Sequence, residues 1–166
     1  MNAVDLPRIR RVTTGHDQGG KARLIGDDGV EASIYSTSGN GFHHLWGADE
    51  PARIGDTAPA AGTLTPVPPV GGHRFGIFRL VPDPTGQGPG LHATDTIDLA
   101  LVLQGELTLE LDSGEQTVLR AGDTLVQNGT AHRWRNNGPD IALLAVVVLG
   151  ADVRPDLRTP APLPDS

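Results

Sequence analysis

Two histidines, His92 and His132, carry the clearest chemistry in this chain. His92 begins the run HATDTIDLALVLQGEL, and His132 lies forty residues later, in GDTLVQNGTAHRWRN. Imidazole is the side chain that proteins most often use to bind a transition metal. Asp98 follows His92 by six residues, and side chains six apart on a β-strand share a face because the side-chain period is two. We therefore predict that His92, Asp98 and His132 bind a divalent transition metal such as Fe, Mn, Ni or Zn.

Thr94 lies on the same face as His92 and Asp98 if that strand extends back to residue 92. A threonine hydroxyl is a poor metal ligand, so this position is predicted to be left to water or substrate. Alternatives stay open, because a histidine at such a site can simply hydrogen-bond a carbonyl group and Asp98 can hydrogen-bond a histidine instead of the metal. Asp95 is a competing acid, whose alternative is an exposed loop residue.

Arg133 and Trp134 follow His132 directly and are predicted to contact substrate, the arginine through a bidentate pair with a carboxylate. The alternative is an exposed pair of arginines, Arg133 and Arg135, on either side of a half-buried Trp134. Tyr35 is the single tyrosine. It could serve the site as an acid or hydrogen-bond donor; the alternative is a structural position in the core or at an interface. His43 and His44 are adjacent, so a regular strand would point them to opposite faces. No catalytic residue is assigned by these patterns.

Short strands separated by glycine turns must position these side chains. The six strands predicted between residues 98 and 149 are 98–104, 107–112, 116–120, 124–127, 132–136 and 141–149. Turn residues recur about every eight to ten positions, which is typical of a β-sandwich or barrel. Strand 98–104 is apolar on both faces, so we predict that it is covered on both sides.

Residues 1–91 are less regular. Further strands are predicted at RIRRVTT, KARLI, VEASIYS, FHHLW and FGIFRLVPD, with proline- and glycine-rich loops at 57–72 and 84–90. We treat 1–166 as a single domain, with an N-terminal extension and strands over 1–74, a barrel core over 75–150 and a proline-rich tail over 151–166. Because an open edge strand invites pairing, RIRRVTT is predicted to cross onto a partner chain in a homodimer.

The amino-acid composition argues against several classes of partner and excludes several kinds of site. A net charge of −7 argues against nucleic acid or an anionic membrane as a partner, since both need a basic face. The absence of cysteine excludes disulfides, zinc–thiolate sites, iron–sulfur clusters and cysteine nucleophiles. The sequence shows neither a signal-peptide pattern nor the roughly 20 apolar residues of a membrane span, so a cytoplasmic location is expected.

The stretch from Leu91 to Leu149 resembles the cupin superfamily, whose barrel carries two partial motifs. The first motif places His-x-His before a glutamate and a glycine; the corresponding residues here are His92, Thr94, Asp98 and Gly105. The second combines glycine, Pro-x-Gly, histidine and asparagine; the corresponding residues here are Gly122, Gln127, Gly129, His132 and Asn136. Thr94 and Gln127 thus stand where the family has a second histidine and a proline.

Both motifs are most similar to those of small single-barrel cupins from bacteria and fungi. The resemblance implies an all-β, single-domain cupin, a double-stranded β-helix or jelly-roll barrel with an N-terminal strand extension. It also implies a metal-dependent enzyme acting on a small polar organic molecule, by oxygenase, isomerase, decarboxylase or lyase chemistry. The alternative is a binding module that holds a small molecule without turnover, its metal site degenerate because the second histidine is missing.

Overall fold

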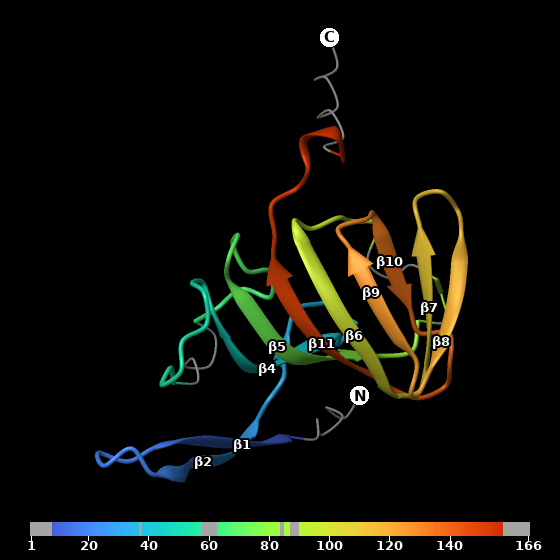
Figure 1. Ribbon diagram of the computed structural model, residues 1–166. Helices are drawn as coiled ribbons and strands as arrows, with labels where there is room; N and C mark the ends of the chain where they lie inside the picture. The colour runs from blue at the N-terminus through green and yellow to red at the C-terminus, as the bar shows by residue number, and fades with distance from the viewer. Residues whose placement is uncertain (1–7, 37, 58–62, 84, 87–89, 158–166) are drawn as a thin grey trace.

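Two β-sheets and a projecting hairpin form the fold in the computed structural model, which describes residues 8–36, 38–57, 63–83, 85–86 and 90–157 (Figure 1). The elements are β1 (Ile9–His16), β2 (Ala22–Val30), β3 (Ser33–Ile34), β4 (Gly41–Ala48), β5 (His73–Leu80), β6 (Thr96–Gln104), β7 (Glu106–Leu111), β8 (Gln116–Arg120), β9 (Thr124–Asn128), β10 (His132–Arg135), β11 (Ala142–Gly150) and the 3-10 turn η1 (Pro155–Leu157). The described part of the predicted tail ends with η1, and its remainder lies outside the described residues.

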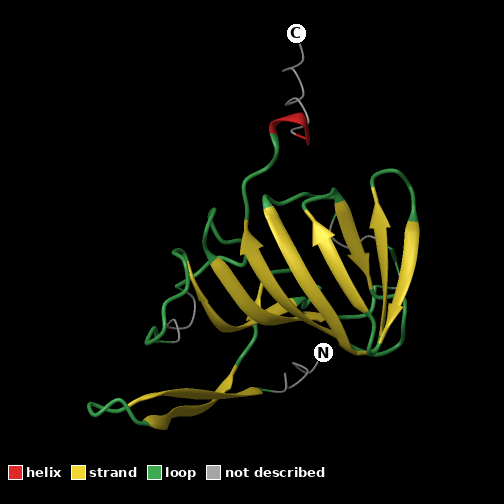
Figure 2. Ribbon diagram, viewed as in Figure 1, coloured by secondary structure: helices red, strands yellow, loops and turns green. Residues whose placement is uncertain are grey.

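The barrel consists of a six-stranded sheet in the order β3-β4-β5-β11-β6-β9 and a three-stranded sheet in the order β10-β7-β8. Each strand pairs antiparallel with its neighbours in these sheets. Figure 2 shows the strands in yellow and the 3-10 turn η1 in red. The predicted all-β cupin barrel is therefore confirmed. Among the described residues, no helix is long and apolar enough to cross a membrane.

The core fills the space between the two sheets. Alternation along the strands supplies it: Ala100 and Val102 of β6 are buried against Leu107 and Leu109 of β7. Buried residues of β11, Leu144 among them, extend the same layer. The turns between strands use glycines with positive φ, such as Gly105 at +80° between β6 and β7. Two apolar inner faces thus hold the sheets together and leave room near one end of the barrel.

The prediction that strand 98–104 is covered on both sides was wrong. Leu99, Leu101 and Leu103 of β6 lie on the outer face of the six-stranded sheet and are 38–45% exposed. No described layer of the chain covers this part of the sheet, since the only sheet opposite it packs on the inner face. An apolar outer face therefore remains open to solvent.

The N-terminal strands form a hairpin, which we call the arm (residues 9–30). β1 pairs with β2 of its own chain, with a register shift between Thr13 and Thr14. Arg10 and Arg11 form side-chain ion pairs across the hairpin with Asp27 and Asp28. Figure 1 shows the arm in blue, projecting beyond the barrel. The predicted strand VEASIYS is interrupted: Val30 ends β2, and after it only Ser33 and Ile34 pair, with β4.

Candidate functional site

A cavity of about 310 Å³ opens between the two sheets, at the end of the barrel where β6 begins and β10 begins. Both histidines predicted as metal ligands contribute to its wall, together with Asp98, Thr94 and Trp134. The complete lining is Tyr35, Pro66, Val67, Phe78, Leu80, His92, Thr94, Thr96, Asp98, His132, Trp134, Leu144 and Val148. The structure therefore brings together five of the six residues predicted for the site.

The two histidines are direct neighbours. His92 and His132 form an isolated antiparallel bridge, and their ring centroids lie 4.7 Å apart with the ring planes at 47°. The surroundings of the two rings differ, because His132 is 4% exposed whereas His92 lies at the exposed rim. Burial, and after it the neighbouring His92, lower the pKa of His132. The His132 ring is thus kept neutral, which is the form that binds a metal.

Both rings are anchored through Nδ1. His92 Nδ1 lies 3.1 Å from the carbonyl oxygen of Gly90, and His132 Nδ1 lies 2.8 Å from that of Thr130. Because a carbonyl oxygen only accepts hydrogen bonds, each Nδ1 carries the hydrogen and each Nε2 keeps a free lone pair. Metal-binding histidines are held in this tautomer in the same way.

Gln127 supports the His132 anchor. Its amide nitrogen donates to the carbonyl oxygen of Thr130 at 2.8 Å and to the Thr130 hydroxyl at 2.6 Å, and it lies 2.9 Å from His132 Nδ1. The side chain is buried on β9. Gln127 stands where the second motif has a proline, and its contact with the loop at Thr130 was not foreseen from the sequence. The sequence signal that could have pointed to it is the glutamine itself, an amide donor at the position where the family has a proline.

Asp98 lies in the cavity wall, and one of its carboxylate oxygens lacks a hydrogen-bond partner among the described residues. Its Oδ1 is buried and has no hydrogen-bond partner among the described residues. Burial raises the pKa of Asp98, and a hydrogen bond from Thr96 and the charges of His132 and His92 offset part of this rise. Thr94 and Thr96 share a hydroxyl hydrogen bond of 2.7 Å beside it. A buried carboxylate oxygen without a partner is one that a metal or a ligand can satisfy.

This donor set fits a divalent transition metal in its chemistry and only partly in its geometry. Two imidazoles and a carboxylate suit Fe, Mn, Ni or Zn. Among the described residues, however, no three His, Asp or Glu side chains converge closely enough to hold an ion. Binding through His92, Asp98 and His132 therefore requires a side-chain movement, for which the exposed ring of His92 has the space.

The remaining wall of the cavity is apolar. Phe78, Leu80, Trp134, Leu144 and Val148 line it from three different strands, and neither lysine nor arginine is among the lining residues. Tyr35 lies near the mouth, edge-on to Phe78 at 6.2 Å between ring centroids. Desolvation raises the pKa of Tyr35 to about 12. The site thus combines a small polar cluster with a wall suited to an uncharged ring or chain.

Arg133 lies outside this lining. Because it alternates with His132 and Trp134 on β10, its side chain projects from the opposite face of the strand. There it pairs with Glu110 of β7 at 2.5 Å, and Arg135 approaches the same carboxylate at 3.2 Å. The hydrogen bond from Arg133 lowers the pKa of Glu110. His43 is also outside the cavity: it is buried on β4, with Nδ1 2.9 Å from the carbonyl oxygen of Val30.

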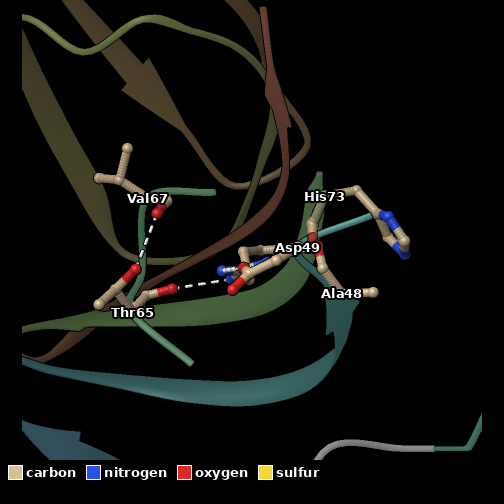
Figure 3. A network of polar contacts seen from close by, with 6 residues as sticks. Ala48, Asp49, Thr65, Val67 and His73 are labelled. Carbon is tan, nitrogen blue, oxygen red and sulfur yellow. Dashed lines mark hydrogen bonds and ion pairs between the residues drawn. The ribbon is translucent and has the colours of Figure 1, made fainter. Parts of the chain in front are cut away.

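A buried arginine fixes one side of the cavity mouth. Arg74, which is 1% exposed, donates to the carbonyl oxygens of Thr65, Ala48 and His73 and pairs with Asp49. Figure 3 shows Ala48, Asp49, Thr65 and His73 gathered at this point, and a hydrogen bond from the Thr65 hydroxyl to the Val67 carbonyl. The loop thus held carries Pro66 and Val67 into the cavity wall. No local pattern in the sequence indicated these contacts of Arg74 with Thr65 and Ala48.

Comparison with known proteins agrees with this architecture. Residues 77–149 match the Cupin domain family. The cupin-domain-containing oxidoreductase srdB of Neurospora crassa is 30% identical over 142 residues, which cover 78% of this chain and 67% of that protein. Phomopsin biosynthesis cluster protein C′ of Diaporthe leptostromiformis is 47% identical over 60 residues, but the match spans only 32% of its length.

Among solved structures, the cupin domain of Cnp3 from Schizosaccharomyces pombe aligns with a TM-score of 0.53. The alignment covers 85% of this chain and 87% of that domain at 11% identity, so it bears on the fold alone. The two motifs, the two-sheet barrel and the similarity to cupin-domain proteins lead to one conclusion. The chain belongs to the cupin family.

Proposed function

We propose that this protein is an oxidoreductase of the cupin type, which holds a divalent transition metal at His92, Asp98 and His132. The observation that carries the proposal is the pair of imidazoles 4.7 Å apart, each anchored through Nδ1 at the mouth of an apolar cavity. The name of srdB, a cupin-domain-containing oxidoreductase, supports the reaction class. The metal, when bound, supplies a Lewis acid or redox centre.

The substrate we propose is a neutral and largely apolar organic molecule that carries an oxygen group. Its apolar part packs against Trp134 and Phe78, while its oxygen lies beside Thr94 and the histidine pair. No described lysine or arginine lines the cavity, so in the metal-free protein a carboxylate group would be buried without a cation. Arg133, the predicted carboxylate partner, is paired with Glu110 instead.

Within this site each residue has a distinct role. His132 is fixed by the Thr130 carbonyl, which Gln127 in turn holds in place, so the ring keeps its position with little loss of side-chain freedom. Asp98 offers its unsatisfied Oδ1 to the metal. The loop at Pro66 and Val67 narrows the mouth and excludes water from the substrate, which strengthens the polar contacts inside.

A non-catalytic binding module is the second candidate. The observation that favours it is that no three described His, Asp or Glu side chains already converge on one point. Thr94, in the position of the family's second histidine, shares its hydroxyl hydrogen bond with Thr96 and leaves the ligand set short by one imidazole. In this account the histidine pair hydrogen-bonds a ligand that leaves unchanged.

Two measurements on purified protein separate these candidates. Isothermal titration with Fe(II), Mn(II), Ni(II) and Zn(II), one at a time, should give one site per chain that is lost in His132→Ala and kept in His16→Ala, a control on the arm. The metal-loaded protein is then incubated in air with 2-naphthalenemethanol, a neutral ring alcohol. Oxidation of the alcohol to the aldehyde, two hydrogens lighter, with one O₂ reduced to H₂O₂ for each alcohol consumed, supports the oxidoreductase. Stoichiometric binding with the alcohol recovered unchanged supports the binding module.

A further inference from the structure

Three side chains at and just before the start of β6 form a hydrogen-bonded row in the cavity wall. They are Thr94, Thr96 and Asp98, alternate residues of the chain that all line the cavity. The hydroxyl oxygens of Thr94 and Thr96 lie 2.7 Å apart, and Thr96 also hydrogen-bonds the Asp98 carboxylate. Because Asp98 Oδ1 has no partner among the described residues, the bond from Thr96 goes to the other carboxylate oxygen. The row therefore runs from Asp98 through the buried Thr96 to the half-buried Thr94.

The direction of these hydrogen bonds follows from the number of hydrogens available. The ionised Asp98 carboxylate, which is the form that can bind a metal, only accepts hydrogen bonds. Thr96 therefore donates its single hydroxyl hydrogen to Asp98. It then has no hydrogen left for Thr94, so Thr94 is the donor in the bond between the two hydroxyl groups.

Thr94 is thus left with a lone pair, and no hydrogen, for a ligand in the cavity. The other polar groups nearby have the same character. His92 and His132 direct their Nδ1 hydrogens at backbone carbonyls, so the remaining ring nitrogen of each, Nε2, is an acceptor. The buried Asp98 Oδ1 is an acceptor as well. A ligand that enters this end of the cavity must therefore bring the hydrogen itself.

We propose that Thr94 selects ligands that carry a hydroxyl group over carbonyl compounds of the same skeleton. An alcohol or phenol donates its hydrogen to Thr94 Oγ1, whereas a carbonyl oxygen would set lone pair against lone pair and leave Thr94 unpaired. Thr96 is a positioning residue, because it acts on the ligand through the hydroxyl of Thr94. Thr94 stands where the family has a second histidine, so the selection belongs to a position at which this chain departs from the motif.

This selection rests on the proposed function, which places the substrate oxygen beside Thr94, and it gives the reaction a direction. The alcohol is the compound that this end of the cavity retains. Its oxidation by O₂, which yields the aldehyde and H₂O₂, removes the hydrogen that Thr94 accepts. The aldehyde is therefore the compound that this end of the cavity releases.

The test compares two probes that differ by two hydrogens, 2-naphthalenemethanol and 2-naphthaldehyde. Equilibrium dialysis at pH 8 measures the dissociation constant of each probe for the full-length, metal-free protein. Thr94→Val keeps the shape of the side chain without its hydroxyl, Thr94→Ser keeps the hydroxyl, and Thr96→Val removes the group that orients it. Thr117→Val is the matched control, because Thr117 is exposed on β8 and does not line the cavity. Circular dichroism confirms that each variant is folded.

We expect the unmodified protein to bind the alcohol about tenfold or more tightly than the aldehyde, because only the alcohol satisfies the acceptor on Thr94. Thr94→Ser and Thr117→Val should keep this ratio of affinities. Thr94→Val and Thr96→Val should each lower it by about fivefold or more, because the first removes the acceptor and the second frees the Thr94 hydroxyl to donate to a carbonyl.

Equal affinities in the unmodified protein, or tighter binding of the aldehyde, overturn the proposal. A ratio that Thr94→Val leaves unchanged also overturns it, and so does an equal loss in Thr94→Val and Thr94→Ser, which would assign the effect to shape. A ratio lowered by Thr94→Val but not by Thr96→Val overturns the role of Thr96. Metal titration separates this result from the proposed function: a preference for the alcohol without metal binding contradicts the metal site alone, and metal binding without that preference contradicts the selection by Thr94 alone.

Discussion

His92 and His132 exchange both of their backbone hydrogen bonds. His92 N–H donates to the His132 carbonyl at 3.0 Å, and His132 N–H donates to the His92 carbonyl at 2.9 Å. The spacing of the two rings is therefore set by the main chain, at a bridge where the segment before β6 meets the first residue of β10. Replacing either imidazole removes a proposed metal ligand without separating the two segments, so each substitution tests the chemistry more than the fold.

Gln127 should affect metal affinity through His132. In Gln127→Ala the Thr130 carbonyl and hydroxyl lose their donor, and the His132 ring loses a neighbour that restricts it. Removing a partner that orients a ligand typically weakens metal binding by about 10- to 100-fold. Calorimetric titration of the variant measures this effect. Gln116→Ala, an exposed glutamine on β8, is the control and should bind as the unmodified protein does.

Arg74 should be among the most sensitive positions for stability. Arg74→Met leaves the Thr65 and Ala48 carbonyl oxygens without their donor and removes a buried cation. We expect the free energy of unfolding to fall by about 3 kcal/mol. Arg120→Met removes an exposed ion pair with Glu106 and should cost less than about 1 kcal/mol. Urea unfolding followed by circular dichroism measures the free energy of unfolding of both variants. Equal decreases in the two variants would contradict the prediction that Arg74 is unusually important for stability.

Tyr35 gives the protein a pH dependence at the alkaline end. Although 47% of the residue is exposed, desolvation raises the pKa of its phenol from 10.0 to about 12. The folded chain keeps a proton that the unfolded chain loses, so the free energy of unfolding should fall as pH rises from 10 to about 12. Because Tyr35 is the single tyrosine, near-ultraviolet phenolate absorbance reports its titration alone. Tyr35→Phe should abolish this fall, and a phenol that titrates near 10 would contradict the prediction.

The charge of the ligand should decide whether it enters the cavity. 2-Naphthol and 2-naphthoate are similar in size, but only the second carries a carboxylate at neutral pH. We expect 2-naphthol to bind the metal-free protein at least about tenfold more tightly, since no described lysine or arginine lines the cavity to compensate a buried carboxylate. Quenching of Trp134 fluorescence in a Trp46→Phe background measures both affinities. Equal or reversed affinities would show that the neutral-substrate assignment is wrong.

Much of the barrel could be predicted from local patterns. Strands β6 to β11 begin and end within about two residues of the predicted ranges, because glycine turns and apolar alternation are local signals. The same alternation separates Arg133 from the cavity: His132 and Trp134 share one face of β10, and Arg133 has to face the other way. That conclusion was available from the sequence, although the adjacency of the three residues suggested a common role.

The rest depended on contacts between distant segments. Tyr35, Pro66 and Val67 reach the cavity from segments with no motif, and Arg74 holds one of these segments across nine residues. The open face of β6 was likewise missed, because an apolar strand gives no information about which of its faces the chain itself covers. The assignment of His92, Asp98 and His132 to a metal stays a prediction.

The most direct test of that assignment is an anomalous difference map from a crystal of the protein soaked with Mn(II) or Fe(II), with data collected at the metal edge. The proposed function predicts one strong peak per chain, within coordination distance of Nε2 of both His92 and His132 and with Asp98 turned towards it. A map with no peak at the histidine pair, or with its strongest peak elsewhere on the chain, would contradict it.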